Sequence, residues 1–144
     1  MKLLIGMNYK KRRMIKLEVI KEIKEIHEGE GYYGGQSGYL IKTDEQEIKV
    51  MIDSHQSCCE NWGYFMTEDN IDKFIGETLY DVKVVDTAQN KESIPDLDYG
   101  GDVMFVDFET SRGVLQFVAY NSHNGYYGHE AIIESRDINE SRML

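Results

Sequence analysis

Two apolar runs separated by a four-residue turn constrain the fold of this chain more than any other feature. The runs are residues 103–108 and 114–120, and the turn between them, residues 110–113, ends in glycine. Short runs rich in β-branched and aromatic residues are typical of strands, and a tight glycine-containing turn joins such strands in antiparallel order. The last third of the chain therefore predicts a β-hairpin.

The same patterning predicts further strands upstream. Residues 39–42 and 47–52 form a second candidate hairpin, in which Ile48, Val50 and Ile52 share one face. Two other runs also have strand character: residues 79–85 and 130–134.

The segment after Met14 combines two periodicities. Apolar residues alternate up to Val19, as in a strand, and then fall at helical spacing from Ile20 to Ile26. Because the β-branched content is high, we expect a strand that bends or bulges near Val19 and Ile20. A helix over residues 16–27 is the alternative.

One short helix, of about two turns, is expected after Thr67. Thr67 or Asp69 can cap its first turn, Ile71 and Phe74 lie on one face, and Gly76 is a natural stop. Together these elements predict an α+β fold, mainly an antiparallel sheet with one or two short helices packed on it.

The charge is distributed unevenly along the 144 residues. Residues 1–17 carry six of the 16 Lys and Arg and no acid, so the remaining 10 basic residues face all 26 acidic ones, a net charge of −16. Such a body repels nucleic acid and attracts basic surfaces. We expect a basic N-terminal extension over residues 1–13, followed by a single domain over residues 14–144.

Neither a membrane span nor a secretion signal is expected. No stretch approaches the roughly 18 apolar residues that a membrane helix requires, and the apolar start of the chain is shorter than a signal-peptide core. Two adjacent cysteines are poorly placed to bridge each other, which fits a reducing compartment. The sequence therefore predicts a cytoplasmic protein.

Both cysteines and the only tryptophan lie in one stretch, residues 53–65, and two more histidines lie in a second stretch, residues 120–129. Thiolate and neutral imidazole are good zinc ligands, and four of them make a closed structural site. If the stretches meet in space, they predict one zinc ion, with Glu60 supporting a ligand histidine. If they do not, the cysteines pack beside Trp62 and the histidines lie at the surface. The candidate ligands are His55, Cys58, Cys59, His123 and His129.

The Cys-Cys-Glu-Asn-Trp-Gly-Tyr segment at residues 58–64 and residues 120–129 resemble a family of small phage and prophage proteins of Firmicutes. The likeness runs over most of the chain from about Met14. That family in turn resembles a zinc-containing anti-CRISPR protein that inhibits the type II RNA-guided DNA nuclease. The resemblance implies a phage-encoded inhibitor, not an enzyme, that binds the nuclease and prevents target-DNA loading. It also implies that the zinc is structural.

The acidic body is complementary to such a partner, since RNA-guided nucleases hold nucleic acid in basic channels. We expect contact with the protein and none with nucleic acid or a membrane. The expected contact residues are acidic side chains in or beside polar loops: Glu68, Asp69, Asp72, Asp96 and Asp98.

Two other functions fit parts of the sequence. A phage sponge for a nucleotide immune signal would use the Tyr/Gly segments at residues 31–38 and 125–128 with Arg112 around an anionic ligand. A hydrolase would pair Cys58 or Cys59 with a downstream histidine as an activated nucleophile.

Overall fold

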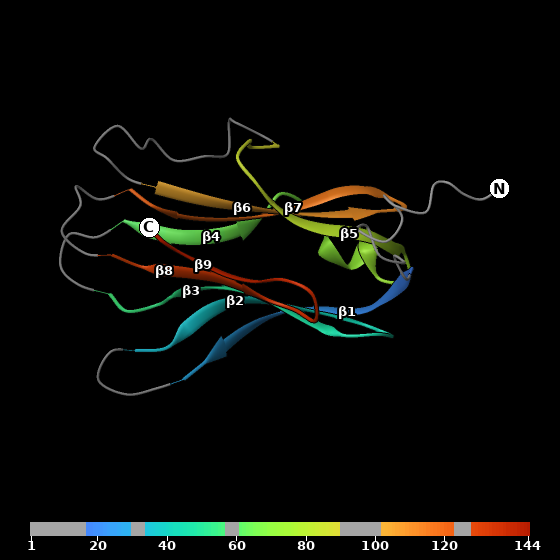
Figure 1. Ribbon diagram of the computed structural model, residues 1–144, viewed down its shortest axis with the longest axis horizontal. Coiled ribbons are helices and arrows are strands. Elements are labelled where there is room, and N and C mark those ends of the chain that lie inside the picture. Colours follow the sequence, from blue (N-terminus) through green and yellow to red (C-terminus); the bar gives the residue numbers. More distant parts are fainter. Residues whose placement is uncertain (1–16, 30–33, 57–60, 90–101, 123–127) are drawn as a thin grey trace, which may run out of the picture.

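The structure, a computed structural model, describes residues 17–29, 34–56, 61–89, 102–122 and 128–144 (Figure 1). The regular structure in these residues is almost entirely β. The first strands are β1 (Glu18–Glu28), β2 (Gln36–Thr43), β3 (Glu47–Asp53) and β4 (Trp62–Met66). A single 3-10 turn, η1 (Ile71–Phe74), follows. The remaining strands are β5 (Thr78–Val85), β6 (Asp102–Thr110), β7 (Gly113–Asn121), β8 (Glu130–Glu134) and β9 (Asn139–Met143).

The nine strands form one antiparallel sheet that folds back on itself into two layers (Figure 1). Its order is β4-β7-β6-β5-β1-β2-β3-β8-β9, with the first four strands in one layer and the last five in the other. Strand β1 joins the layers: Glu18 and Val19 pair with β5, and the residues from Ile20 onward pair with β2. Hairpins between consecutive strands could not alone produce this order, because β8 pairs with β3 although β4 to β7 lie between them in the sequence.

A break in β1 allows the sheet to turn this corner. The register with β2 shifts between Ile20 and Glu22, as a β-bulge would, and bulges bend and twist the strand that carries them. The predicted bend near Val19 and Ile20 is therefore confirmed. The helical alternative is wrong over the part of residues 16–27 that the structure describes.

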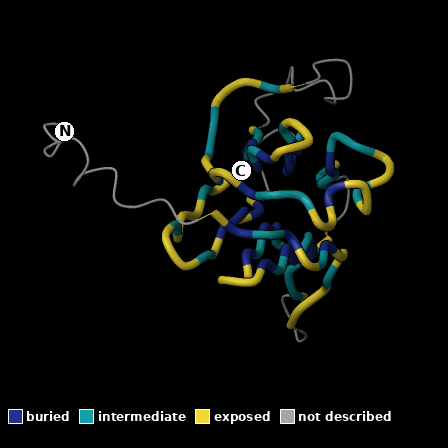
Figure 2. The backbone as a smooth tube through the Cα atoms, turned by 90° about the vertical axis from the view of Figure 1, so that its right-hand side faces the viewer, coloured by how far each residue is buried: buried dark blue, intermediate teal, exposed yellow. Residues whose placement is uncertain are grey.

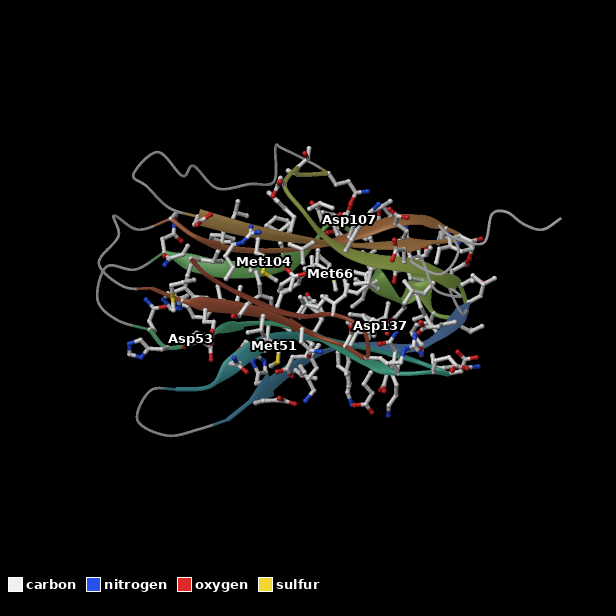
Figure 3. The ribbon with its side chains drawn as sticks, viewed as in Figure 1. Met51, Asp53, Met66, Met104, Asp107 and Asp137 are labelled. Atoms are coloured by element: carbon white, nitrogen blue, oxygen red, sulfur yellow. The ribbon has the colours of Figure 1, made fainter. Side chains whose placement is uncertain are left out.

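The core lies between the two layers (Figure 2). Ile48, Val50 and Ile52 of β3 are fully buried on one face, as the alternating pattern predicts. Met66 and Met104 project between the layers (Figure 3), where they meet the apolar side chains of β3 and β7. Each such side chain contributes about 1.5–3 kcal/mol through removal from water, so this face holds the layers together.

The predicted α+β class is wrong. Instead of a helix after Thr67, the chain makes only the single turn η1, which buries only Phe74 and begins at Asn70 without a side-chain cap. Thr67 does not act as a cap because its backbone N–H donates to the Gln116 carbonyl over 3.0 Å and its hydroxyl accepts the Gln116 N–H over 3.0 Å. Thr67 therefore continues the β4–β7 ladder, and the residues left for a helix are too few to offset the cost of nucleation.

The two predicted hairpins and the two other predicted runs are confirmed as β2–β3, β6–β7, β5 and β8. Sequence patterning missed β4 and β9. Strand β4 contains Gly63, and β9 has only one apolar residue, Met143. Among the described residues, no helix has the length and apolar character needed to cross a membrane.

Candidate metal centre

The two stretches singled out in the sequence meet at one end of the fold. Residues 53–62 pass from β3 in one layer to β4 in the other, and residues 121–130 pass from β7 back to β8 (Figure 1). Ladder pairing joins the stretches in one layer, through Trp62 and Asn121, and in the other layer it joins the residues just outside them, Ile52 and Ala131. The described ends of the two stretches therefore lie next to each other, as one metal site shared between them would require.

Hydrogen bonds outside the strand ladders also join the two stretches. Ser122 donates to the Asn61 carbonyl through its backbone N–H over 2.8 Å and through its hydroxyl over 2.9 Å. Asn61 is the residue directly after Glu60, and Ser122 directly precedes His123. The contact therefore lies where the two candidate ligand segments leave the described residues.

His129 is the best-defined candidate ligand. It is fully buried, and backbone hydrogen bonds of 3.0 and 2.9 Å pair it with Leu144. Its Nδ1 lies 2.7 Å from the carbonyl oxygen of Asp53, at the end of β3 (Figure 3). A carbonyl only accepts, so Nδ1 is the donor and carries the proton in the neutral ring. This tautomer leaves Nε2 as the nitrogen with a lone pair, and a donor bond to a backbone carbonyl is the usual support of a metal-binding histidine.

One aromatic side chain, that of Trp62, fixes the plane of this imidazole. The Trp62 ring stacks on it with a centroid separation of 5.0 Å and an interplanar angle of 27°. Trp62 is itself held by a 2.7 Å hydrogen bond from its indole N–H to Gln56. The tryptophan reaches from β4 across to the β8 layer, so the stack closes this end of the core.

His55 lies beside His129. Their ring centroids are 6.5 Å apart and the rings are tilted by 35°. The backbone N–H of His55 donates to the Asp53 side chain over 2.9 Å, an Asx turn that ends β3. Gly34 packs against this turn with φ of +76°, and a Cβ there would lie 3.2 Å from the His55 Cα. The backbone around His55 is therefore fitted closely between β2 and β3.

The donor set that the structure describes is consistent with a metal ion but incomplete by itself. Among the described residues, no group of three or more His, Cys, Asp or Glu is arranged to hold an ion. Of the predicted ligands, His55 and His129 are brought together. Cys58, Cys59 and His123, together with the supporting Glu60, lie outside the described residues.

The predicted partner-binding acids fall into two groups. Glu68 and Asp69 precede η1 and Asp72 lies within it; Glu68 forms an ion pair with Lys73 over 2.9 Å, and the two aspartates are exposed. Asp96 and Asp98 lie outside the described residues.

The nucleotide-binding alternative loses part of its predicted site. Arg112 lies in the β6–β7 turn, 3.7 Å from Glu77. Strand β7 separates it from Asn121, about 26 Å at roughly 3.3 Å per residue. Of the glycine-rich residues 125–128 the structure describes Gly128, which precedes His129 at that far end, so Arg112 and Gly128 lie at opposite ends of β7.

A polar cluster between the layers was not expected from the sequence. The hydroxyl of Tyr64 on β4 donates to Glu25 on β1. Ser37, on β2, hydrogen bonds with Tyr64 and lies 2.7 Å from His27 Nδ1. Burial, with Glu25 adding to it, raises the pKa of Tyr64 well above its usual value of 10. The sequence pattern predicts which face of its own strand each of these residues occupies. It does not predict which strands of the two layers face each other, so the cluster could not be foreseen.

The matches to known families and proteins are few. A family model described as "Domain of unknown function (DUF7448)" matches residues 16–133. No curated protein and no solved structure matches the chain. The matched residues include both stretches that meet at the histidine pair. Because the match covers well over half of the chain, this protein belongs to the DUF7448 family.

Proposed function

We propose that this protein is a phage-encoded inhibitor that binds the type II CRISPR effector nuclease in the host cytoplasm and blocks loading of target DNA. It acts by binding and has no enzymatic activity. A structural zinc ion stabilises its fold. The proposed ligands are His55 and His129, with Cys58, Cys59 and His123 as candidates for the remaining positions.

The observation that carries the zinc proposal is the environment of His129. A fully buried imidazole whose Nδ1 donates to a backbone carbonyl has the tautomer of a metal-ligating histidine, with the lone pair on Nε2. His55 lies beside it on the same turn, and cysteines at residues 58 and 59 follow three and four positions along the chain. Thiolate and imidazole together form the donor set that zinc prefers in structural sites.

A structural role fits the position of this centre. The five candidates can fill all four tetrahedral positions with side chains, whereas a catalytic zinc keeps one position open for water. The segments they belong to connect β3 with β4 and β7 with β8. An ion held by both segments would close a long loop between the two layers, and its binding free energy would add to the stability of the fold.

The choice of partner rests on the resemblance of residues 58–64 and 120–129 and on charge. The chain beyond residue 17 has a net charge of −16. An acidic surface accelerates encounter with a protein that holds nucleic acid in basic channels, and it disfavours direct binding to DNA.

The test is a titration of the zinc-containing full chain against purified type II nuclease, with target-DNA loading and cleavage as readouts. We expect binding to the nuclease and loss of DNA loading, with a cleavage rate that falls in proportion to occupancy. Duplex DNA alone is the control for non-specific binding, and a panel of cyclic nucleotides tests the sponge alternative. Tight binding of a cyclic nucleotide without nuclease binding would contradict the proposal.

A further inference from the structure

The sheet has two free edges, and they differ in how they are protected. At one end of the strand order, β9 (Asn139–Met143) carries Glu140 and Arg142. At the other end, β4 has the sequence Trp-Gly-Tyr-Phe-Met, without a charge or a proline. Proteins usually protect free edges against pairing with another chain by charges, prolines or bulges. Strand β4 has neither a charged residue nor a proline, and its ladder with β7 is regular, without a bulge.

The backbone of β4 directs hydrogen-bonding groups away from β7. In an antiparallel ladder, hydrogen-bonded pairs alternate with non-bonded pairs. Asn61 accepts from Ser122 and Thr67 donates to Gln116, so the bonded pairs fall at odd-numbered residues of this strand. The N–H and C=O groups of Trp62 and Tyr64 therefore point toward the free edge. Among the described residues, no second strand pairs with β4.

This edge is accessible to solvent. Gly63 consists of backbone alone and is partly exposed, so the main chain of β4 itself reaches water. The flanking side chains are also half-buried: Tyr64 on the face between the layers, and Phe65 on the outer face, 6.3 Å from the Tyr120 ring. A strand added here would place alternate side chains against these two aromatic faces.

The charges around β4 favour a basic occupant. Glu25 accepts from the Tyr64 hydroxyl in the middle of the strand, and Glu68 and Asp69 follow its C-terminal end. Pairing of β4 with a second copy would bring these carboxylates together and oppose two chains of net charge −10. A segment with lysine or arginine at alternate positions would instead meet opposite charge.

We propose that β4 binds an extended basic segment of a partner protein by strand addition, with basic side chains facing Glu25 and apolar ones facing Phe65. The identification of the partner as the nuclease rests on the proposed function. Strand addition itself rests on the edge, its exposure and its charge.

The test uses the ¹⁵N-labelled full chain and a short peptide of alternating valine and lysine, followed by amide hydrogen exchange. We expect exchange at the amides of Trp62 and Tyr64 to slow by about tenfold or more, because they gain partners. The amides of Gly63 and Phe65 are bonded to β7 in both states and serve as internal references. A peptide of alternating valine and glutamate is the matched control and should have no effect.

Two variants distinguish binding at the β4 edge from non-specific binding. Phe65→Lys places a charge on the edge and should abolish protection, whereas Met143→Lys on β9 should leave it unchanged. Glu25→Lys, which keeps the edge apolar but reverses the charge near it, should weaken binding of the lysine peptide at least several-fold. Unchanged exchange at Trp62 and Tyr64 under saturating peptide, protection at β9 instead, or equal binding of the glutamate peptide would overturn the proposal.

The same exchange measurement with the type II nuclease separates the two proposals. Nuclease binding with protection of Trp62 and Tyr64 supports both. Nuclease binding without that protection overturns strand addition and leaves the inhibitor proposal standing. Binding of the lysine peptide at β4 without nuclease binding overturns the inhibitor proposal and leaves strand addition standing.

Discussion

Two buried polar centres lie at opposite ends of β3, and they are stabilised in different ways. At its start is Glu18, 6% exposed, which accepts from the Thr43 hydroxyl over 2.7 Å and from Gln46 over 2.9 and 3.0 Å, and lies 3.2 Å from an Arg136 nitrogen. At the end of β3 is His129, fully buried against Trp62. The first centre is a carboxylate neutralised by protein hydrogen-bond donors and a guanidinium.

The centre around His129 is built mainly from aromatic rings instead of a carboxylate and a guanidinium. Beside the two imidazole rings and the indole lies the Asp53 carboxylate, which accepts the His55 backbone N–H. The hydrogen bond from His129 to the Asp53 carbonyl fixes the tautomer that a metal-binding histidine has. If the proposed zinc ion is bound, one end of the fold is closed by an internal ion pair and the other by an external cation. The two ends should therefore respond differently to chelators, to pH and to substitution.

The largest expected effect is removal of the ion. Protein purified without a nickel column should contain about one zinc per chain by elemental analysis. Chelation, Cys59→Ser or His129→Gln should remove it and destabilise the fold by about 4 kcal/mol or more, the stabilisation that a ligand gives at 1,000 times its Kd. The measurements are metal content and urea denaturation. Arg136→Met is the control, because it should leave the metal content unchanged.

A metal-free protein that melts at the same temperature with and without chelator would falsify the zinc assignment. In that case His129 would be a core histidine held by Asp53 and Trp62 alone.

Loss of the ion pair at the other end of β3 should have a smaller effect. Arg136→Met removes the cation and leaves the Glu18 carboxylate its neutral donors, Thr43 and Gln46, and we expect a loss of about 1–3 kcal/mol, the usual cost of removing one partner of a buried polar group. Because Arg136 is itself substantially exposed, solvent screening places the effect toward the low end. Denaturation of the variant with and without chelator should give additive losses, since the two centres share no residue.

These two centres also differ in how far the sequence predicts them. Clustering of cysteine and histidine at residues 53–65 and 120–129 singled out His55 and His129 among five candidates, because these residue types are rare and stand out, and the structure brings these two together. Glu18, Thr43 and Gln46 look like ordinary polar residues, and only the topology brings them together. The bend in β1 was predictable because its apolar period changes at Val19 and Ile20.

The fold class was mispredicted for a related reason. The spacing of Ile71 and Phe74 is compatible with a helix, but Thr67 pairs with Gln116, a contact across 49 residues that local patterning cannot reveal. Strand β9 has no apolar alternation, and it forms because β8 offers a free edge. Pairing with another strand decided both cases against the local signal, across 49 residues for Thr67 and within the β8–β9 hairpin for β9.

Alkaline pH should destabilise the Tyr64–Glu25 contact between the layers. The pKa of Tyr64 is raised in the folded state by burial first and by Glu25 second. The folded state therefore holds this proton more tightly, so its contribution is complete below the unfolded pKa of about 10 and is lost as pH rises above it. Tyr64→Phe should flatten the dependence of unfolding free energy on pH between about 9 and 11, measured by urea denaturation and tyrosinate absorbance. A slope identical to that of the unsubstituted protein would contradict the assignment.

The smallest expected effect on the fold, and the most informative for function, is reversal of exposed charge. Glu68→Lys, Asp69→Lys and Asp72→Lys together change the η1 region, where the described residues form one ion pair, between Glu68 and Lys73, and surface pairs are worth about 0.2–1 kcal/mol. Stability and metal content should therefore change little.

Nuclease binding should respond much more strongly than stability to this reversal. Charge complementarity acts mainly on encounter, so the association rate should fall several-fold at low salt and the difference should shrink as salt screens it. A parallel reversal of Asp96 and Asp98 tests the second predicted group, and reversal of Glu134 and Glu140 at the β9 edge is the matched control. If the η1 and β9 reversals reduced the rate equally, the total charge would matter and not its position, and the assignment of Glu68, Asp69 and Asp72 as contact residues would be wrong.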